Sequence, residues 1–294
     1  MFDFGSGYDV IPHRVAVSSA GAVPYQTFVL RREPVDVKQR WPIVFIHGCC
    51  SIGGTYWDIT VDGRPGWASI ALAAGYVTYV IDLPGHGRSP QPPDFALMGL
   101  DKAVAAVREL LGHIGPAVLV GHSMGGAVIT RTFGVLSPAE RATVVAAVLV
   151  DPARVAELNA GAPPRPGLEN RLHAVADYTD ATPRGRWYPD ELYQRQQAWR
   201  GPESGRSFAE MVTAEFGAVG DPAPFAGIPT LLLAAEPDLG IGQDTIDAYH
   251  DHYGLPITSV GVDWGLPGHG HGLNVEVGNE LIAARLLNWL AQLR

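Results

Sequence analysis

Hydrophobic residues along the chain gather in short continuous runs, and the segments between these runs show helical spacing. A short apolar run is typical of a strand that is buried on both faces of a parallel sheet. Such runs lie at residues 42–46, 77–82, 117–120, 144–150, 229–234 and 257–262. Residues 14–18 and 25–31 are expected to add an antiparallel edge, and helices are expected at residues 67–74, 100–113, 126–133 and 277–293. This alternation predicts an α/β fold with a mostly parallel, doubly wound sheet of about eight strands.

The pattern breaks down at residues 153–225. This stretch is rich in Pro, Arg, Gln, Trp and Tyr, and it contains no apolar run of the kind that forms a buried strand. Helices are expected in it near residues 168–178, 190–199 and 208–216. We therefore predict a core made of residues 1–152 and 226–294, with residues 153–225 inserted as a helical cap. The cap should cover the carboxyl ends of the strands, where sheets of this kind bind their ligands.

A serine stands between a predicted strand and a predicted helix, in the motif Gly121-His122-Ser123-Met124-Gly125. In the G-x-S-x-G motif a sharp turn exposes the serine hydroxyl at the head of a helix. Backbone N–H groups there favour negative charge, and the glycines allow the strand and the helix to approach closely. The motif predicts that Ser123 is a nucleophile. The alternative is a serine that only caps the helix.

A serine nucleophile needs a base, and the base needs an acid that orients it. His271 is the expected base, because it lies in the loop between the last strand and the last helix, and His269 is the alternative. Asp151 and Asp238 each end a predicted strand, and either could be the acid, with Glu236 as a third candidate. The two histidines could also suggest a metal site, but the loop offers no clear third ligand.

The oxyanion of an ester-cleaving site needs two backbone donors. We expect them to be the N–H of Met124 and the N–H of Cys49, in the loop after residues 42–46. Cys49 and its neighbour Cys50 are the only two cysteines of the chain. They could be packed free thiols or a disulfide. Consecutive Cα atoms lie about 3.8 Å apart, below the usual disulfide range that begins near 4.4 Å, so a bond between them would be strained.

Composition narrows the possible partners and compartments. The 294 residues carry 21 basic and 30 acidic side chains, a net charge of −9, and the basic residues are scattered, which argues against nucleic acid and an anionic membrane surface as partners. No apolar stretch is long enough for a transmembrane helix. The start of the chain shows no signal peptide, which predicts a cytoplasmic protein. An oxidised Cys49–Cys50 pair would instead favour a secreted or periplasmic protein whose signal had been removed.

Several motifs together resemble the α/β-hydrolase superfamily over essentially the whole chain. They are His47-Gly48, Gly85-His86-Gly87-Arg88-Ser89, Gly121-His122-Ser123-Met124-Gly125-Gly126, and Gly270-His271 with Glu276. A narrower resemblance, to a small esterase subfamily, rests on four further segments. They are His47-Gly48-Cys49-Cys50, Asp62-Gly63-Arg64-Pro65-Gly66-Trp67, Gly75-Tyr76 and Gly268-His269-Gly270-His271.

The narrower resemblance implies two features of the site. In that subfamily the adjacent cysteines form a disulfide beside the oxyanion hole, which implies a Cys49–Cys50 bond here. The subfamily's acid follows the strand after the nucleophile helix, which implies Asp151, although the subfamily has a glutamate at this position. The turn around Asp238 matches the acid of the wider superfamily, and Asp238 is kept as the alternative.

These features predict a serine carboxylester hydrolase that works through an acyl-enzyme and needs no cofactor or metal. Its substrate would be a small to medium, partly apolar ester. The same residues would serve a lactonase, or an esterase or cyclase acting on a secondary metabolite. A serine at this turn disfavours dehalogenation and epoxide opening, which use an aspartate nucleophile in this fold. The alternative outside catalysis is a binding protein that keeps a hydrolase-like pocket for its ligand.

Overall fold

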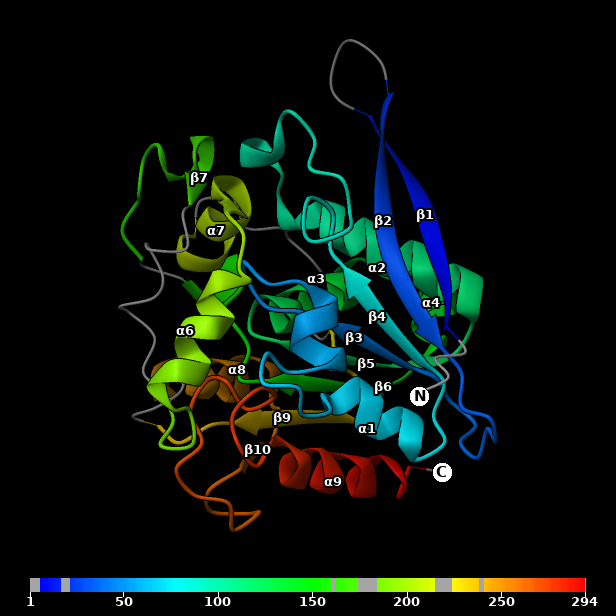
Figure 1. Ribbon diagram of the computed structural model, residues 1–294. Coiled ribbons are helices and arrows are strands. Elements are labelled where there is room, and N and C mark those ends of the chain that lie inside the picture. The colour runs from blue at the N-terminus through cyan, green and yellow to red at the C-terminus, as the bar shows by residue number, and fades with distance from the viewer. Residues whose placement is uncertain are drawn as a thin grey trace.

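The computed structural model describes residues 6–16, 22–159, 162–173, 184–214, 224–237 and 241–293. Its main sheet has eight strands in the order β1-β2-β4-β3-β5-β6-β9-β10 (Figure 1). These strands are β1 (Ser6–Ala16), β2 (Ala22–Arg32), β3 (Ile43–Ile46), β4 (Thr78–Asp82), β5 (Ala117–His122), β6 (Val144–Val150), β9 (Thr230–Ala234) and β10 (Ile257–Ser259). β1 pairs antiparallel with β2 and β2 with β4, whereas all other neighbours are parallel. The predicted mostly parallel sheet is confirmed.

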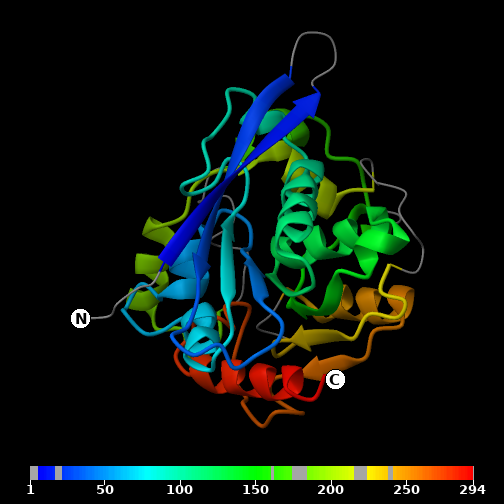
Figure 2. The same ribbon diagram turned by 90° about the vertical axis from the view of Figure 1, so that its right-hand side faces the viewer.

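The central strands are continuous apolar runs because both faces of the sheet are covered. Along β3, Val44 and Ile46 belong to one hydrophobic cluster, and Ile43 and Phe45 belong to the cluster on the other face. All four side chains are fully buried. The β1–β2 hairpin at the edge is longer than predicted, and Figure 2 shows its two long strands crossing the upper part of the molecule. The last strand, β10, ends three residues before the predicted boundary at residue 262.

Helices cover both faces of the sheet. Residues of α2 (Leu100–Ile114), α3 (Met124–Val135) and α8 (Gln243–Tyr253) belong to one cluster, and residues of α1 (Trp67–Ala73) and α9 (Asn279–Leu290) belong to the other. Figure 1 shows α1 and α9 together in the lower part of the view. A short helix, α4 (Pro138–Arg141), begins with a capping box at Ser137. The π-helical turn at Gly54–Asp58 and the 3₁₀ turn at Phe95–Leu97 lie in loops that follow β3 and β4. In the described part of the chain, no helix combines the length and apolar character needed to cross a membrane.

The segment predicted as a cap contains mainly short elements. They are the 3₁₀ turns Ala156–Asn159 and Leu168–Asn170, the strands β7 (Leu172–His173) and β8 (Glu203–Ser204), and the helices α6 (Asp190–Ala198) and α7 (Gly205–Val212). Figure 1 shows α6 and α7 on the side of the molecule toward which β9 points. The carboxyl ends of parallel strands therefore face this segment.

One predicted helix is wrong in its described part. Residues 168–173 of the expected 168–178 helix form a 3₁₀ turn followed by a strand, because Leu172 and His173 pair antiparallel with β8. A side chain on Gly205 would lie 2.2 Å from two carbonyl oxygens of this turn, so the turn packs directly on the start of α7. This tertiary packing overrides the local helical pattern. Residues 174–178 lie outside the described part. α7 itself begins before the predicted residue 208, because Ser204 caps it.

Candidate active site

Ser123 lies at the turn between β5 and α3 in a strained conformation. Its φ of 51° and ψ of −117° are rare for a residue with a side chain, and such strain costs about 1–3 kcal/mol. Hydrogen bonds of its backbone hold it in this conformation. Its N–H donates to the carbonyl of Val150 (3.0 Å), and its carbonyl accepts from the N–H groups of Gly126 (2.9 Å) and Ala153 (2.9 Å). The turn is therefore fixed from both the strand side and the helix side.

Glycines make this turn sterically possible. A Cβ on Gly121 would lie 2.4 Å from the carbonyl oxygen of Gly125, and a Cβ on Gly125 would lie 2.3 Å from the carbonyl oxygen of Ile46. Both obstacles are backbone atoms, which cannot rotate away as a flexible side chain can. The glycines therefore allow α3 to approach β5 and β3 as closely as the sequence pattern predicted.

His271 and Asp151 lie against each other across 120 residues of sequence. The Nδ1 atom of His271 is 2.6 Å from Oδ2 of Asp151. The Asp151 carboxylate is 1% exposed, and it also accepts hydrogen bonds from the N–H groups of Ile241 (2.8 Å) and Ala235 (3.4 Å). An ionised carboxylate can only accept, so the proton of this pair lies on Nδ1 of His271. The other ring nitrogen, Nε2, is then free to accept a proton.

The other candidates for base and acid have different partners. His269 Nδ1 is 3.1 Å from Oε2 of Glu276, whose carboxylate also accepts from the N–H of Gly270. Glu236 accepts from the N–H of Gly268 at 2.8 Å. Both contacts order the loop that carries His271. Asp238 lies outside the described residues. Of the residues that can be compared, the structure pairs Asp151 with His271.

A second histidine holds the main chain of His271. The ring of His122 lies between the carbonyl of His271 (2.6 Å from Nε2) and the hydroxyl of Tyr56 (2.5 Å from Nδ1). Burial, and then the neighbouring ring of His271, lowers the pKa of His122, so this ring is neutral. Its Nε2–H therefore donates to the carbonyl, and Nδ1 accepts from Tyr56. Tyr56 has no motif that would have identified it.

In the described part of the chain, the two expected oxyanion donors have no protein group as a hydrogen-bond acceptor. Within the described ranges, the N–H of Cys49 donates no hydrogen bond to a protein group, and the N–H of Met124 donates none outside α3. Cys49 and Ser123 line the same cavity. The loop that carries Cys49 is held at the next residue, where Cys50 has a φ of 62° and donates its N–H to Glu203 Oε2 at 3.1 Å. The Cys49 N–H is thus available to a ligand beside Ser123.

Cys49 and Cys50 are free thiols in the structure, and the disulfide implied by the resemblance is not formed. The short Cα separation of neighbouring residues opposes such a bond. Burial, followed by the hydrogen bond with Cys50, raises the pKa of the Cys49 thiol, which disfavours the nucleophilic thiolate. The two sulfur atoms and a Glu203 oxygen form the one group of three potential metal ligands found in the described part. The Glu203 carboxylate is already bonded to His86 Nε2 (3.0 Å) and to Cys50.

Comparison with known proteins identifies the family of this chain. A sequence model of the alpha/beta hydrolase family matches residues 43–285. The chain belongs to the alpha/beta hydrolase family. Membership confirms the resemblance found in the sequence, and the described sheet is the α/β-hydrolase fold.

Relatives of this hydrolase-family chain carry different activities in their names. It is 43% identical over 77 residues to a protein described as a probable secreted lipase from a fungus (Fungal sp.), covering 25% of this chain and 21% of that protein. It is 35% identical over 115 residues to a non-heme chloroperoxidase of Streptomyces lividans, covering 39% of this chain and 38% of that protein. The matches thus span well under half of either relative.

A solved structure of low identity supports the fold. The crystal structure of a probable hydrolytic enzyme from Pseudomonas aeruginosa aligns with a TM-score of 0.66 and 22% identity. The alignment covers 97% of this chain and 95% of that chain. At this identity the likeness shows the shared hydrolase fold.

The main cavity of this alpha/beta hydrolase contains Ser123 and His271. Its volume is about 590 Å³. The apolar part of its wall comes from α7 and the loop before α8, and the polar part contains three arginines and one aspartate. The apolar side includes Phe208, Met211, Val212 and Ile241, and the polar side includes Arg154, Arg165, Arg200 and Asp244. A ligand in this cavity would meet both surfaces.

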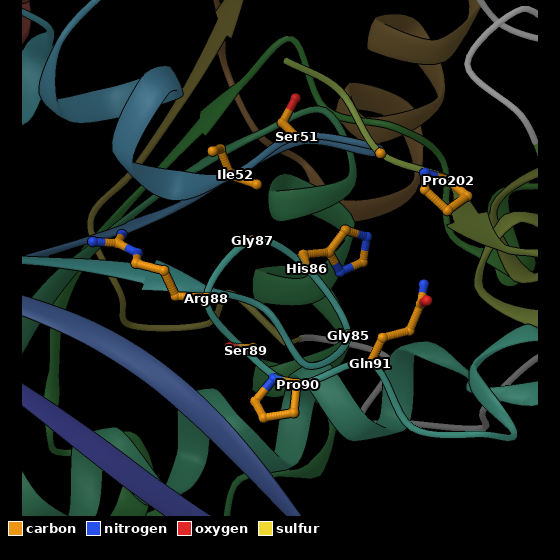
Figure 3. A pocket seen from close by; sticks show the side chains of 11 residues that line it. Ser51, Ile52, Gly85, His86, Gly87, Arg88, Ser89, Pro90, Gln91 and Pro202 are labelled. Atoms are coloured by element: carbon orange, nitrogen blue, oxygen red, sulfur yellow. The ribbon is translucent and has the colours of Figure 1, made fainter. Parts of the chain in front are cut away.

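A second cavity of about 300 Å³ lies between residues 85–91 and the segment that contains Gly201 and Pro202. Figure 3 shows His86 between Arg88 and Gln91 in its wall. The charged side chains here already have protein partners, because His86 contacts Glu203 and Arg88 contacts Asp82 (2.7 Å). Cys49, which carries one of the two unpaired backbone donors, and Ser123 line the main cavity instead.

His47, at the end of β3, is a fully buried neutral imidazole. Its Nε2 accepts from the N–H of Leu83 (3.0 Å), so Nδ1 carries the proton and donates to the carbonyl of Gly48 (2.8 Å). Burial, with a smaller contribution from His86, lowers the pKa of His47 to about 4. Between pH 6.5 and pH 4 the unfolded chain binds a proton at this residue and the folded chain does not. The free energy of unfolding must therefore fall as the pH falls through this range.

We expect His47 alone to cost about 2 kcal/mol of stability between pH 8 and pH 5. The measurement is urea unfolding of wild type and His47→Gln at both pH values. The glutamine amide can still accept from Leu83, but it does not titrate. The difference between the two proteins cancels the contributions of other groups. Equal losses in the two proteins would show that His47 is not held neutral in the folded state.

Proposed function

We propose that the protein is a serine hydrolase that cleaves carboxylic esters through an acyl-enzyme. The observation that carries this proposal is the 2.6 Å contact between His271 Nδ1 and Asp151 Oδ2, in a site whose cavity also exposes the strained Ser123. Family membership supports the fold, and the lipase among the relatives supports ester substrates. Because a chloroperoxidase is also among the relatives, family membership alone does not define the reaction, and the proposal rests on the residues of the site.

The proposed mechanism gives each of these residues one role. Ser123 Oγ attacks the ester carbonyl carbon, and His271 Nε2 takes the hydroxyl proton and then gives it to the leaving alcohol. Asp151 holds the ring in the required tautomer and stabilises the imidazolium. The N–H groups of Cys49 and Met124 donate to the oxyanion of the tetrahedral intermediate. A water molecule, activated by the same histidine, then releases the acid and restores Ser123.

The cavity indicates the size and polarity of the substrate. Its volume of about 590 Å³ suits a small to medium molecule. Phe208, Met211 and Ile241 offer an apolar wall for one part of the ester. The proposed chemistry needs neither a metal nor an organic cofactor, since the nucleophile, base, acid and oxyanion donors all come from the chain.

A pre-steady-state assay with p-nitrophenyl acetate and p-nitrophenyl butyrate tests the proposal. We expect wild type to release a burst of one nitrophenolate per active site, and peptide mass spectrometry to find the acyl group on Ser123. Ser123→Ala should show neither signal. Absence of a burst, with equal rates for wild type and Ser123→Ala, would contradict hydrolysis and favour a protein that binds its ligand without cleaving it.

A further inference from the structure

Arg200 is a partly buried cation without a counter-ion in the proposed active site. It follows α6 and lines the main cavity together with Ser123 and His271. Its Nε is buried without a hydrogen-bond partner, and no carboxylate of the described residues forms an ion pair with its guanidinium. A guanidinium stays charged in proteins, and withdrawing such a charge from water without a partner is costly. The protein tolerates that cost beside its reactive residues.

Two hydrogen bonds fix the backbone around Arg200. The N–H of Gly201 donates to the carbonyl of Cys50 at 2.9 Å, and Glu203 accepts from the N–H of Cys50 at 3.1 Å. The segment that carries Arg200 is thereby fastened to the loop that carries Cys49, the proposed oxyanion donor. This arrangement holds the cation in place before a ligand arrives, which lowers the entropic cost of binding.

The charge of the cavity is opposite to that of the whole protein. The chain has a net charge of −9, yet the described lining of the cavity has three arginines and a single carboxylate, Asp244. Asp244 is already paired with Arg154 at 2.6 Å. The cations left over are Arg165 at the exposed rim and Arg200 near the reactive residues. A cavity of this kind attracts anions.

A second polar group without a hydrogen-bond partner, the hydroxyl of Tyr188, belongs to a residue that shares a pocket with Arg200. Arg200 and Tyr188 both line a side pocket of about 20 Å³ that also reaches His271. The hydroxyl of Tyr188 is buried and has no hydrogen-bond partner. Burial raises the pKa of Tyr188, so the hydroxyl keeps its proton and can donate it in a hydrogen bond. Two donors without acceptors thus meet in a pocket with room for a group about the size of one water molecule, such as one carboxylate oxygen.

We infer that Arg200 is a specificity-determining residue that binds a carboxylate group of the substrate. The inference rests on the proposed function, and it narrows the substrates to esters that also carry a free carboxylate, such as monoesters of dicarboxylic acids. A guanidinium matches the two oxygens of a planar carboxylate with parallel N–H donors, and the Tyr188 hydroxyl supplies a further donor. The apolar wall of the cavity then receives the rest of the ester.

Matched pairs of substrates test this inference. Monoethyl adipate and diethyl adipate differ by a carboxylate on the acyl side, and 4-acetoxybenzoate and 4-acetoxybenzamide differ by a carboxylate on the alcohol side. In at least one pair, wild type should prefer the charged ester about tenfold or more in kcat/KM. In Arg200→Gln this preference should fall by about 10- to 100-fold, the range of a charged hydrogen-bonded pair. Arg200→Lys, which keeps the charge but not the planar fork, should retain part of it.

Arg195→Gln is the matched control. Arg195 lies on α6, is exposed, and forms an i,i+4 ion pair with Glu191, so its removal changes the charge without touching the cavity. In Arg195→Gln, the ratio of kcat/KM for the charged ester to kcat/KM for the neutral ester should stay within about twofold of the wild-type ratio, since exposed ion pairs contribute little. An unchanged ratio in Arg200→Gln, or a wild-type preference for the neutral ester in both pairs, would overturn the inference.

A binding measurement separates this inference from the proposed function. Calorimetric titration of monoethyl adipate and of 4-acetoxybenzoate into Ser123→Ala, with and without Arg200→Gln, does not depend on turnover. Weaker binding in the double variant would support the carboxylate site even if wild type hydrolysed no ester. Equal binding of each charged ester to the two proteins would contradict the carboxylate site, while Ser123-dependent hydrolysis of the neutral esters would leave the proposed function intact. Melting temperatures of all variants report whether each one folds.

Discussion

Replacing Ser123 by alanine is expected to lower kcat for p-nitrophenyl butyrate by about five to six orders of magnitude. In the proposed mechanism the change removes the atom that forms the acyl-enzyme, and His271 then has no hydroxyl to activate. What remains is the stabilisation of the oxyanion by the N–H groups of Cys49 and Met124, which can still assist direct attack by water. A loss of this size identifies the residue that forms the covalent bond.

The fold should survive this substitution. Alanine and serine differ by the hydroxyl, and in the described part of the chain Ser123 Oγ forms no hydrogen bond that alanine would break. The backbone bonds to Val150, Gly126 and Ala153 are kept. Steady-state rates and thermal unfolding of wild type and Ser123→Ala are the measurements. Turnover close to wild type in a folded Ser123→Ala protein would show that another group is the nucleophile.

Replacing Asp151 by asparagine is expected to lower kcat by about four orders of magnitude. Asparagine has the shape of aspartate but no charge to stabilise the imidazolium of His271. Both carboxylate oxygens of Asp151 now accept from the backbone, from Ala235 and from Ile241. An asparagine NH₂ group in either position would face an N–H donor, so the variant also disturbs the orientation of the ring. The loss should therefore appear in kcat more than in KM.

Glu236→Gln and Asp238→Asn are the comparison variants for this prediction. Glu236 accepts from Gly268 N–H, and a glutamine carbonyl can still accept there. Both variants should keep activity within about tenfold of wild type, because neither removes the partner of His271. Stopped-flow measurement of acylation for the three variants compares them directly. A larger loss in Asp238→Asn than in Asp151→Asn would move the role of the acid to Asp238.

Local pattern was sufficient for much of the fold and for the turn at Ser123. β3 and β5 could be predicted because both faces of a central strand are buried, which demands continuous apolar residues. The turn at Ser123 could be predicted because Gly121 and Gly125 face backbone atoms at distances that exclude any side chain. In both cases the physical constraint acts on neighbouring residues and therefore leaves a mark in a short stretch of sequence.

Contacts between segments that are far apart in the sequence could not be predicted, and only the structure shows them. His269 and His271 are two residues apart in one glycine-rich loop, and only the packing of that loop against the end of β6 places His271 at Asp151. The prediction of a helix at residues 168–178 was wrong for a similar reason. The described part of this segment pairs with β8, which lies some 30 residues further along the chain. Arg200 carries no motif, and its unpaired charge is visible only once the surrounding cavity is complete.

Whether a feature could be predicted from the sequence depends on how far apart its interacting groups lie along the chain. Strand and helix periodicity, and the glycines of the turn at Ser123, reflect sterics and burial that each residue meets through its near neighbours, so the chain itself records them. The contact between His271 and Asp151, the neutral state of His122 and the charge of the cavity depend on groups that lie far apart in sequence. Electrostatics and hydrogen bonds between such groups depend on ångström-scale distances, and only the folded arrangement sets those distances.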